Sequence, residues 1–241
     1  FESLFLHQRL RRFFNLARHV IAADMEQSMA LIEYFYSAHS AFAYLGSARF
    51  MHIAETAQRR IVHKPFDLHS AMLASGGAPF ARRSAAHMAY FFGREIERWS
   101  EERGAPTLGR VPTHHAKDFT LANCMLIAAI EAGHCVDQLA HTMLEAHWRR
   151  DADLSDERAL AAIARTVQLE PQPLLEAALT QKVRAQYHSN TQEAVQRSVF
   201  GSPTYFVDGD MFYGQDRLEM VERALRNPYP NAWKPREHTP A

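Results

Sequence analysis

The sequence predicts an α/β fold in which an all-helical segment interrupts a strand-rich domain. Two observations carry this prediction. Residues 31–36 and 61–66 are strand-like runs joined by a helical stretch, which is the pattern of a parallel β-α-β unit. Strand signals then stop over residues 68–198 and return within residues 199–227. We therefore expect residues 29–67 and 199–227 to form one domain, with residues 68–198 as a helical domain inserted into it.

The composition is that of an ordinary globular chain of 241 residues, 47% of them hydrophobic and 22% charged. Basic and acidic residues number 27 each, and this charge balance argues against a nucleic-acid-binding protein. No apolar run approaches the roughly 20 residues of a membrane span. Cys124 and Cys135, if they share one helix, lie about 16 Å apart along it, too far for a disulfide. We therefore expect a cytoplasmic protein without nucleic-acid or membrane partners.

The first elements follow in order from residue 1. Residues 1–28 have the pattern of an amphipathic helix, which we expect to be an extension that packs on the body or on a partner subunit. Binding to a membrane surface is the alternative for this extension. The strand at 31–36 leads through the loop 37–40 into a helix from Ala41 to about Gln58.

Helical patterns fill the inserted segment. Residues 81–103 carry apolar side chains at helical spacing, and Asp118 can cap a helix over 119–132 that ends at Gly133. Further helices are expected over residues 135–149, 155–167 and 181–197, and one more starts at Pro171 to Pro173. We interpret the aromatic residues within 90–99 as core, with one of them available to line an apolar pocket between the two domains.

Residues 198–220 concentrate several geometric signals in a short stretch. They contain a Gly201-Ser202-Pro203 turn, a strand at 204–207, an Asp208-Gly209 hairpin turn, a second strand at 211–213 and a helix that opens near Gln215. Pro203 stands between a glycine-containing turn and a strand, and we predict a cis peptide bond before it. The amide and carbonyl groups of Ser202 would then be unpaired by the sheet and free to pair with an extended peptide.

Ser40 stands at the junction between the first strand and its helix. Serine is a preferred N-cap residue, so the structural interpretation is a helix cap. The functional interpretation is a hydroxyl that hydrogen-bonds a bound thiolate, where the helix dipole also lowers the thiol pKa from its free value of about 8.5. Both interpretations stay open on the sequence alone.

Three short motifs, taken together, resemble one enzyme family. They are residues 40–46, residues 200–204 and residues 214–217. Over about residues 32–225 the chain is similar to the 2-hydroxychromene-2-carboxylate isomerase family and to its relative, kappa-class glutathione transferase. The resemblance implies a thioredoxin-like domain with an inserted all-helical domain, as in the disulfide oxidoreductases. The two reactive cysteines of those oxidoreductases match Ser40 and Ala43, so dithiol redox chemistry is excluded.

The resemblance implies a glutathione-dependent isomerase of an aromatic-degradation intermediate such as 2-hydroxychromene-2-carboxylate. Ser40 would be the catalytic residue that stabilises the thiolate, which adds to the conjugated substrate before ring opening, bond rotation and elimination. Ser202 and Pro203 would bind the peptide backbone of glutathione, and Gln215 with Asp216 would hold its γ-glutamyl end. A helix start offers amide groups to the carboxylate, and a carboxylate there can take the ammonium group. A helix-start charge without a ligand is the structural alternative for Asp216.

The chain departs from the family where the glycyl end of glutathione would lie. The asparagine and lysine usual there fall at about Gly77 and His87. Arg82 or Arg83 could supply the missing cation, and His87 could do so at mildly acidic pH. A thiol other than glutathione is the alternative. Two further departures are Ala41 in place of a proline and Ser202 in place of an aliphatic residue.

Other functions remain as alternatives. His134, His141 and Glu145 share a helical face, but no paired ligand motif occurs among the 14 histidines, so no metal site is predicted. His39 and Ser40 are adjacent but lack the Gly-x-Ser-x-Gly context of a hydrolase. The open rivals are a kappa-like glutathione transferase and a non-catalytic peptide- or ligand-binding module. We expect a small-molecule substrate and leave a homodimer open.

Overall fold

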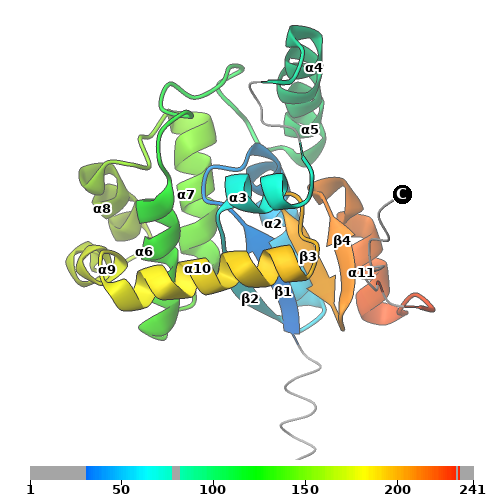
Figure 1. Ribbon diagram of the computed structural model, residues 1–241. Helices are drawn as coiled ribbons and strands as arrows, with labels where there is room; N and C mark the ends of the chain where they lie inside the picture. The colour runs from blue at the N-terminus through cyan, green and yellow to red at the C-terminus, as the bar shows by residue number, and fades with distance from the viewer. Residues whose placement is uncertain (1–30, 78–81, 232, 234–241) are drawn as a thin grey trace, which may run out of the picture.

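The computed structural model describes residues 31–77, 82–231 and 233, and within them the chain has the expected α/β fold. The predicted extension over residues 1–28 lies outside the described residues. One mixed sheet has the strand order β2-β1-β3-β4, with β1 parallel to β2 and antiparallel to β3 (Figure 1). The strands are β1 (Leu31–Tyr36), β2 (Arg60–Pro65), β3 (Thr204–Val207) and β4 (Asp210–Tyr213).

Helices occupy the segment between β2 and β3, as the sequence predicts. The strand β1 is followed by α2 (Ala41–Thr56), and β2 is followed by α3 (Leu68–Ala74), α4 (Ala85–Ala89), the π-helical turn η2 (Tyr90–Arg94), α5 (Glu95–Arg103), α6 (Thr120–Glu131), α7 (Asp137–Arg150), α8 (Glu157–Thr166), α9 (Pro171–Ala178) and α10 (Gln181–Gln196). After β4 come the 3₁₀ turn η3 (Gln215–Arg217) and α11 (Leu218–Arg226). None of the described helices combines the length and the hydropathy that crossing a bilayer requires.

Caps and turns explain several boundaries. Asp67 caps α3 by accepting hydrogen bonds from the amides of His69 and Ser70. This short helix was not predicted. The expected start of α8 at Ser155 is wrong, because Asp156 is the N-cap. The β3–β4 turn is confirmed: Asp208 and Gly209 have φ angles of 50° and 85°, the signs that a two-residue hairpin turn requires.

Helices cover both faces of the sheet. Alternate residues of β1 point to opposite sides, so Ile32, Tyr34 and Tyr36 pack in a large core with α2 and α11 while Phe35 packs in a smaller cluster with α3 and α10. Figure 1 shows α10 crossing one face of the sheet. The larger core also contains buried residues of α6, α7, α8 and α9, so apolar packing is continuous between the sheet and the inserted helices. The division into two domains stays a prediction.

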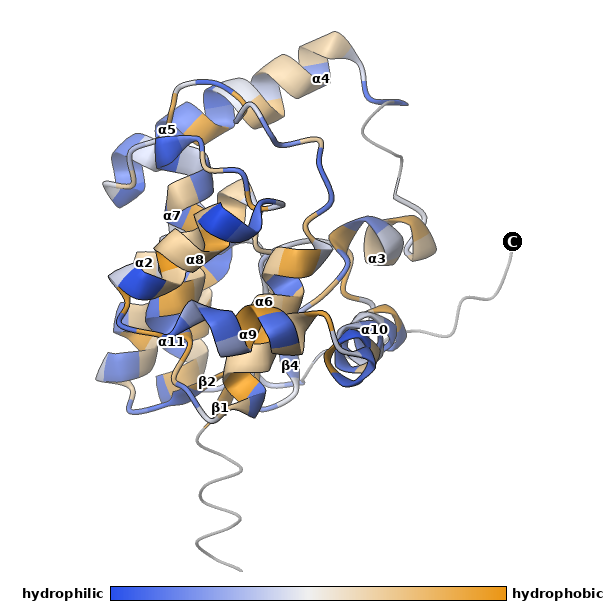
Figure 2. Ribbon diagram, turned by 90° about the vertical axis from the view of Figure 1, so that its left-hand side faces the viewer, coloured by the Kyte–Doolittle hydropathy of each residue, from blue (hydrophilic) through white to orange (hydrophobic). Residues whose placement is uncertain are grey.

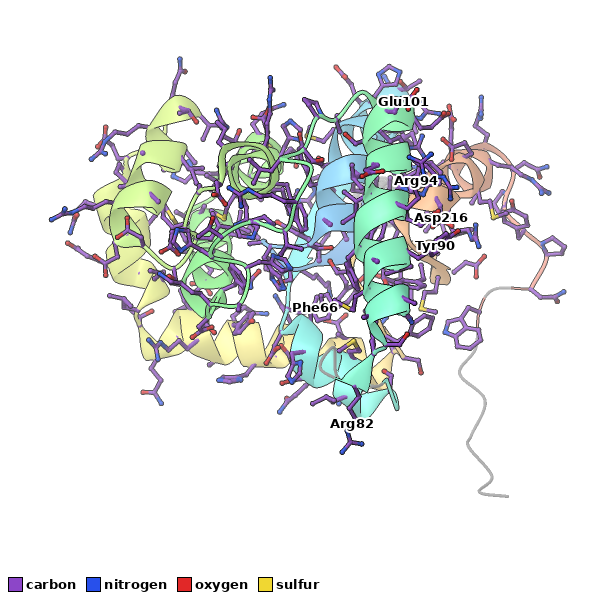
Figure 3. All side chains as sticks on the ribbon, turned by 90° about the horizontal axis from the view of Figure 1, so that it is seen from above. Phe66, Arg82, Tyr90, Arg94, Glu101 and Asp216 are labelled. Atoms are coloured by element: carbon purple, nitrogen blue, oxygen red, sulfur yellow. The ribbon has the colours of Figure 1, made fainter. Side chains whose placement is uncertain are left out.

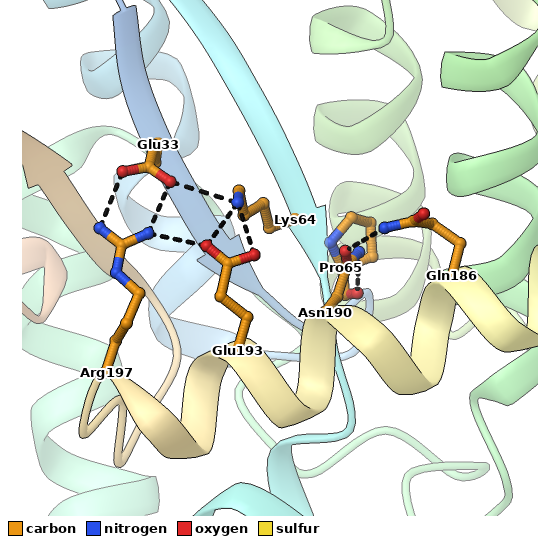
Figure 4. A network of polar contacts seen from close by, with 7 residues as sticks. All are labelled: Glu33, Lys64, Pro65, Gln186, Asn190, Glu193 and Arg197. Carbon is orange, nitrogen blue, oxygen red and sulfur yellow. Dashed lines mark hydrogen bonds and ion pairs between the residues drawn. The ribbon is translucent and has the colours of Figure 1, made fainter.

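The helix α10 is held to the sheet by four charged side chains (Figure 4). Arg197 donates two hydrogen bonds of 2.6 and 2.8 Å to Glu33 of β1, and one of 2.8 Å to Glu193. Lys64 of β2 contacts both carboxylates, at 3.2 Å from Glu33 and 2.6 Å from Glu193. The charges are partly buried and each has an opposite partner, so removal of one side chain would leave an uncompensated charge.

The pieces α4, η2 and α5 follow one another as a single long helix at the edge of the molecule (Figures 1 and 2). Its last turn ends at Gly104, which has a left-handed φ of 59°. The hydropathy colouring of Figure 2 marks this helix as mixed, and Ile96 is the one residue of α5 that is fully buried. The predicted helix over 81–103 therefore exists from residue 85, interrupted by the π turn.

We expect Gly46→Ala to destabilise the protein by about 1–3 kcal/mol, although alanine is the better helix former. A methyl group at Gly46, in the middle of α2, would lie 2.6 Å from Cβ of Gln215 and 3.2 Å from Leu218. Gly93→Ala is the matched control, since a methyl group there meets nothing within 4 Å. Urea unfolding should find the control neutral or more stable by up to about 1 kcal/mol; equal stability of the two variants would contradict the packing argument.

We expect the stabilisation by Glu33 to depend on pH. Burial opposes the charge of Glu33, but the bonds to Arg197 and Lys64 outweigh it and hold the pKa below its ordinary value. A lowered folded-state pKa stabilises above the unfolded-state pKa, and the stabilisation is lost as the pH falls through the folded-state value. Glu33→Gln should therefore lower the free energy of unfolding by about 1–3 kcal/mol at pH 7.

The same difference should shrink below about pH 4, where a glutamate of ordinary pKa is already protonated. Glu97→Gln is the control, because the Arg94–Glu97 pair is more than half exposed, at 58% and 55%, and such pairs contribute about 0–1 kcal/mol. Urea unfolding of both variants at several pH values is the measurement. A Glu33→Gln difference that is the same at pH 7 and pH 3 would contradict the assignment.

Candidate functional site

Two loops that are far apart in the sequence meet at the start of α2. The Ser202–Pro203 peptide bond is cis, as predicted. The Ser37 amide donates a hydrogen bond of 3.1 Å to Oγ of Ser202, and the Ser40 hydroxyl donates one of 3.0 Å to the Ser202 carbonyl oxygen. These contacts join the loop after β1 to the loop before β3. The side chain of Ser202 is the acceptor in the first of these bonds, a contact that an aliphatic side chain could not make.

The structural interpretation of Ser40 is confirmed, and its role toward a thiolate stays a prediction. Its Oγ accepts a hydrogen bond from the Ala43 amide at 3.2 Å, which makes it the N-cap of α2. Its single hydroxyl proton is donated to Ser202. The Ser202 carbonyl oxygen therefore already accepts one hydrogen bond, from the serine that was expected to face a ligand. A carbonyl oxygen can accept two, so its pairing with an extended peptide stays a prediction.

A cavity of about 360 Å³ opens beside this pair of serines. Ser40 and Ser202 line it on one side, and Gly77, Arg83, Phe92 and Tyr213 are among the residues that line the rest. Its volume lies within the range of about 300–1,000 Å³ that is usual for small-molecule sites. The cavity begins at the N-terminus of a 16-residue helix, where amide groups and the helix dipole favour a negative charge.

The three residues considered as the cation for the glycyl carboxylate of glutathione differ in position. Arg83 lines the cavity, where it lies 5.8 Å from the Phe92 ring centre and donates to the Met72 sulfur at 3.6 Å. Arg82 is exposed and its side chain points away from the body (Figure 3). His87 is exposed as well, packs edge-on against Phe91 at 5.7 Å and is not among the cavity residues. Of these three residues, Arg83 alone lines the cavity that Ser40 and Ser202 also line.

Gly77 explains why no asparagine stands at that position. A methyl group there would lie 2.7 Å from Cγ and 2.8 Å from the carbonyl oxygen of Met72. The backbone of Gly77 itself lines the cavity and its amide donates to the Met72 carbonyl oxygen at 2.9 Å. Any larger side chain would have to displace the end of α3.

Gln215 and Asp216 lie outside the lining of this cavity. Gln215 is buried, with 1% exposure, and its side-chain oxygen accepts a hydrogen bond of 3.0 Å from Arg103 of α5. Asp216 is 40% exposed and pairs with Arg217 at 2.8 Å. The side chain of Gln215 is thus engaged in holding α5 against η3, and the role of both residues toward a γ-glutamyl group stays a prediction.

The apolar wall comes from the π turn. Phe91 and Phe92 of η2 line the cavity, and the Phe42 ring of α2 stands 5.0 Å from the Phe91 ring. One member of the aromatic run was expected to line a pocket, and two do so. Opposite them, Gly201 allows the Tyr213 ring to lie against the backbone, because a methyl group at Gly201 would collide with that ring.

A second cavity, of about 620 Å³, lies next to the first, and both are lined by His39, His115 and Trp148. The His39 ring stacks on Phe119 at 4.1 Å and its Nδ1 is 2.9 Å from the Ser37 hydroxyl. Nδ1 of His115 is 3.0 Å from Nε2 of His147. Sequence spacing did not reveal this cluster, because its members come from three separate segments.

Burial keeps the three imidazoles neutral. Desolvation, with a smaller effect from the neighbouring His115 and His147, lowers the pKa of His39 to about 3. Desolvation and His147 lower the pKa of His115 to about 4. The pKa of His147 is lowered mainly by burial as well. At neutral pH these side chains therefore act as hydrogen-bonding groups without charge.

Two of the three residues on the helical face weighed as a metal site, His141 and Glu145, contact other side chains. Nδ1 of His141 is 2.7 Å from the Ser47 hydroxyl, and Glu145 pairs with Arg149 at 2.8 Å. Among the described residues no group of three or more histidine, cysteine or acidic side chains could hold a metal ion. Cys124 is buried, Cys135 is exposed, and both are free thiols.

Comparison with known proteins finds relatives of the kind that the sequence motifs indicated. 2-Hydroxychromene-2-carboxylate isomerase of Sphingobium xenophagum is 26% identical over 194 residues, which cover 80% of this chain and 97% of the relative. Glutathione S-transferase kappa 1 of Homo sapiens is 26% identical over 133 residues, which cover 48% of this chain and 59% of the relative. The resemblance seen in the sequence is thus confirmed.

Solved structures share the fold. A 2-hydroxychromene-2-carboxylate isomerase structure has a TM-score of 0.68 at 20% identity, covering 81% of this chain and 94% of that one. The cytosolic disulfide reductase DsbM of Pseudomonas aeruginosa, solved with GSH, has a TM-score of 0.56 at 14% identity, with coverages of 82% and 93%. The family model of the DSBA-like thioredoxin domain matches residues 31–226. The chain therefore belongs to the DSBA-like thioredoxin domain family.

Proposed function

We propose that this protein is a glutathione-dependent isomerase of an aromatic-degradation intermediate, similar in activity to 2-hydroxychromene-2-carboxylate isomerase. The observation that carries the proposal is the 360 Å³ cavity with the Ser40 hydroxyl, the Ser202 backbone and the Arg83 guanidinium around it. Glutathione, when bound, would supply a thiolate nucleophile. The absence of cysteine at positions 40 and 43 leaves that sulfur to come from a ligand.

The hydrogen bond between Ser40 and Ser202 suggests how this chain receives a peptide. An extended peptide beside the cis-proline loop offers an amide donor to the Ser202 carbonyl oxygen, as an added strand does. That donor replaces the Ser40 hydroxyl, whose proton becomes available for a sulfur at the N-terminus of α2. The Ser40 hydroxyl would therefore have an acceptor both without the ligand, when it donates to Ser202, and with the ligand, when it donates to the sulfur.

Arg83 fits the carboxylate at the glycyl end. Guanidinium groups bind carboxylates through charge-assisted hydrogen bonds, and Arg83 lines the same cavity as the two serines. We assign Gln215 and Asp216 to the γ-glutamyl end on the resemblance, with Asp216 as the carboxylate for the ammonium group. The buried side chain of Gln215 leaves its backbone amide for that role.

A glutathione transferase is the second candidate, favoured by the similarity to the human kappa-class enzyme. Analysis of the products separates the two reactions, since transfer accumulates a stable thioether and isomerisation does not. The free thiols of Cys124 and Cys135 support a reducing compartment, and we propose the cytoplasm. The substrate is a small molecule in either case.

Arg83→Ala should weaken glutathione binding by about 10-fold or more, the effect expected for losing a charge-assisted hydrogen bond. Arg82→Ala is the matched control, because its neighbouring charge lies outside the cavity. Calorimetric titration of the wild type and both variants with reduced glutathione measures the effect. Equal affinities for the two variants would contradict the role of Arg83, and no binding by the wild type would overturn glutathione as the ligand.

Ser40→Ala should reduce turnover of 2-hydroxychromene-2-carboxylate by about 100-fold, as for loss of one donor to a developing anion. It should also cost about 1 kcal/mol of stability, because the serine caps α2. Ser84→Ala removes a cap of the same kind, at α4, and should leave turnover unchanged. Absorbance assays with urea unfolding of both variants provide the test; unchanged turnover in Ser40→Ala would rule out its catalytic role.

A further inference from the structure

The hydrogen bonds of His147 and His115 determine which ring nitrogen of each histidine carries the proton. The Ala152 carbonyl oxygen can only accept, so Nδ1 of His147, 2.9 Å away, must carry a proton and donate it. A neutral His147 then has a lone pair on Nε2, and Nδ1 of His115, 3.0 Å from it, must be the donor. A neutral His115 is left with its lone pair on Nε2.

His115, which carries this lone pair, lines both cavities. In the described part of the chain its Nε2 has no hydrogen-bond partner. The ring is held in place by Trp148 at 5.1 Å, by His147 at 5.3 Å and by His39 at 5.3 Å between centres. A rigid ring with a fixed tautomer is a preorganised hydrogen-bond acceptor.

The surroundings of this acceptor are mostly apolar. The walls of the 620 Å³ cavity include Met88, Phe92, Val111, Phe119 and Trp148. The charged side chains that line it are already engaged: Lys117 pairs with Asp153 at 2.5 Å, and Asp118 and Asp67 accept hydrogen bonds at helix starts. An aromatic molecule with a hydroxyl group matches this combination of flat apolar walls and one fixed acceptor.

We propose that Nε2 of His115, at the 620 Å³ cavity, accepts the hydrogen bond by which the protein recognises a hydroxyl group of its aromatic substrate. His147 is a positioning residue, because it acts by holding the tautomer of His115. The inference rests on the proposed function and deepens it by naming the cavity and the residue that recognise the substrate. The thiol would bind in the adjoining 360 Å³ cavity, so the two molecules would occupy separate sites.

The test uses 2-naphthol and 2-methoxynaphthalene, in which a methyl group replaces the hydroxyl proton, titrated into the full chain without thiol. The wild type should bind 2-naphthol about 5-fold more tightly, the ratio for one neutral hydrogen bond. His115→Phe keeps an aromatic ring against Trp148 but has no acceptor, so it should bind the two probes equally and 2-methoxynaphthalene as the wild type does.

His114→Phe is the matched control, because this adjacent side chain is not among the cavity residues and should leave the 5-fold preference intact. A preference that persists in His115→Phe would overturn the proposal, and so would failure of the wild type to bind either probe. Since no thiol is present, a failed glutathione titration leaves this result unaffected. The two proposals can thus fail independently.

A measurement on the wild type covers the case in which His115→Phe does not fold. Long-range proton–nitrogen NMR spectra distinguish the two neutral tautomers of each histidine. His115 and His147 should both carry their proton on Nδ1 at pH 7, with Nε2 unprotonated, and addition of 2-naphthol should move the Nε2 resonance of His115. A proton on Nε2 of His115, or no shift on addition of the probe, would overturn the assignment.

Discussion

The hydrogen bond from the Ser40 hydroxyl to the Ser202 carbonyl oxygen is the contact on which the site depends. It spans 162 positions of the chain and joins the start of α2 to the loop before β3. The amide of Ser37 adds a second bond to the same residue. Buried polar groups without partners are costly, so these bonds hold the two loops in one arrangement. The cavity beside them is therefore preformed by the protein.

The loop 37–40 is fixed from its other side by the inserted helices. Asn123 of α6 accepts a hydrogen bond from the Ala38 amide at 3.0 Å, and the indole of Trp148 on α7 donates to the His39 carbonyl oxygen at 2.8 Å. A loop four residues long thus connects the sheet with the helical segment, and its residues line both cavities. The proposed function needs such a rigid loop, because two ligands react only when both are held in a fixed geometry.

Sequence patterns predicted what depends on neighbouring residues. The strand at 31–36 and the hairpin at 208–209 follow from alternation and from turn chemistry. The resemblance singled out Ser40 and Ser202, which are in contact. The pairing of Arg103 with Gln215, the position of Arg83 and the histidine cluster were not predictable in this way. Each depends on which helices pack against one another, and the spacing of residues along the chain does not encode this packing.

Because of the π turn Tyr90–Arg94, the deletion of a single residue would change the arrangement of one edge of the molecule. Such a turn amounts to an α-helix with one residue inserted, and each residue rotates a helix by about 100°. Deleting one residue there would turn α4, and the chain leading to it from Arg83, by about a quarter of a revolution relative to α5. Members of the family could therefore alter the shape of their ligand site through an indel, while the sheet and the serine pair stay as they are.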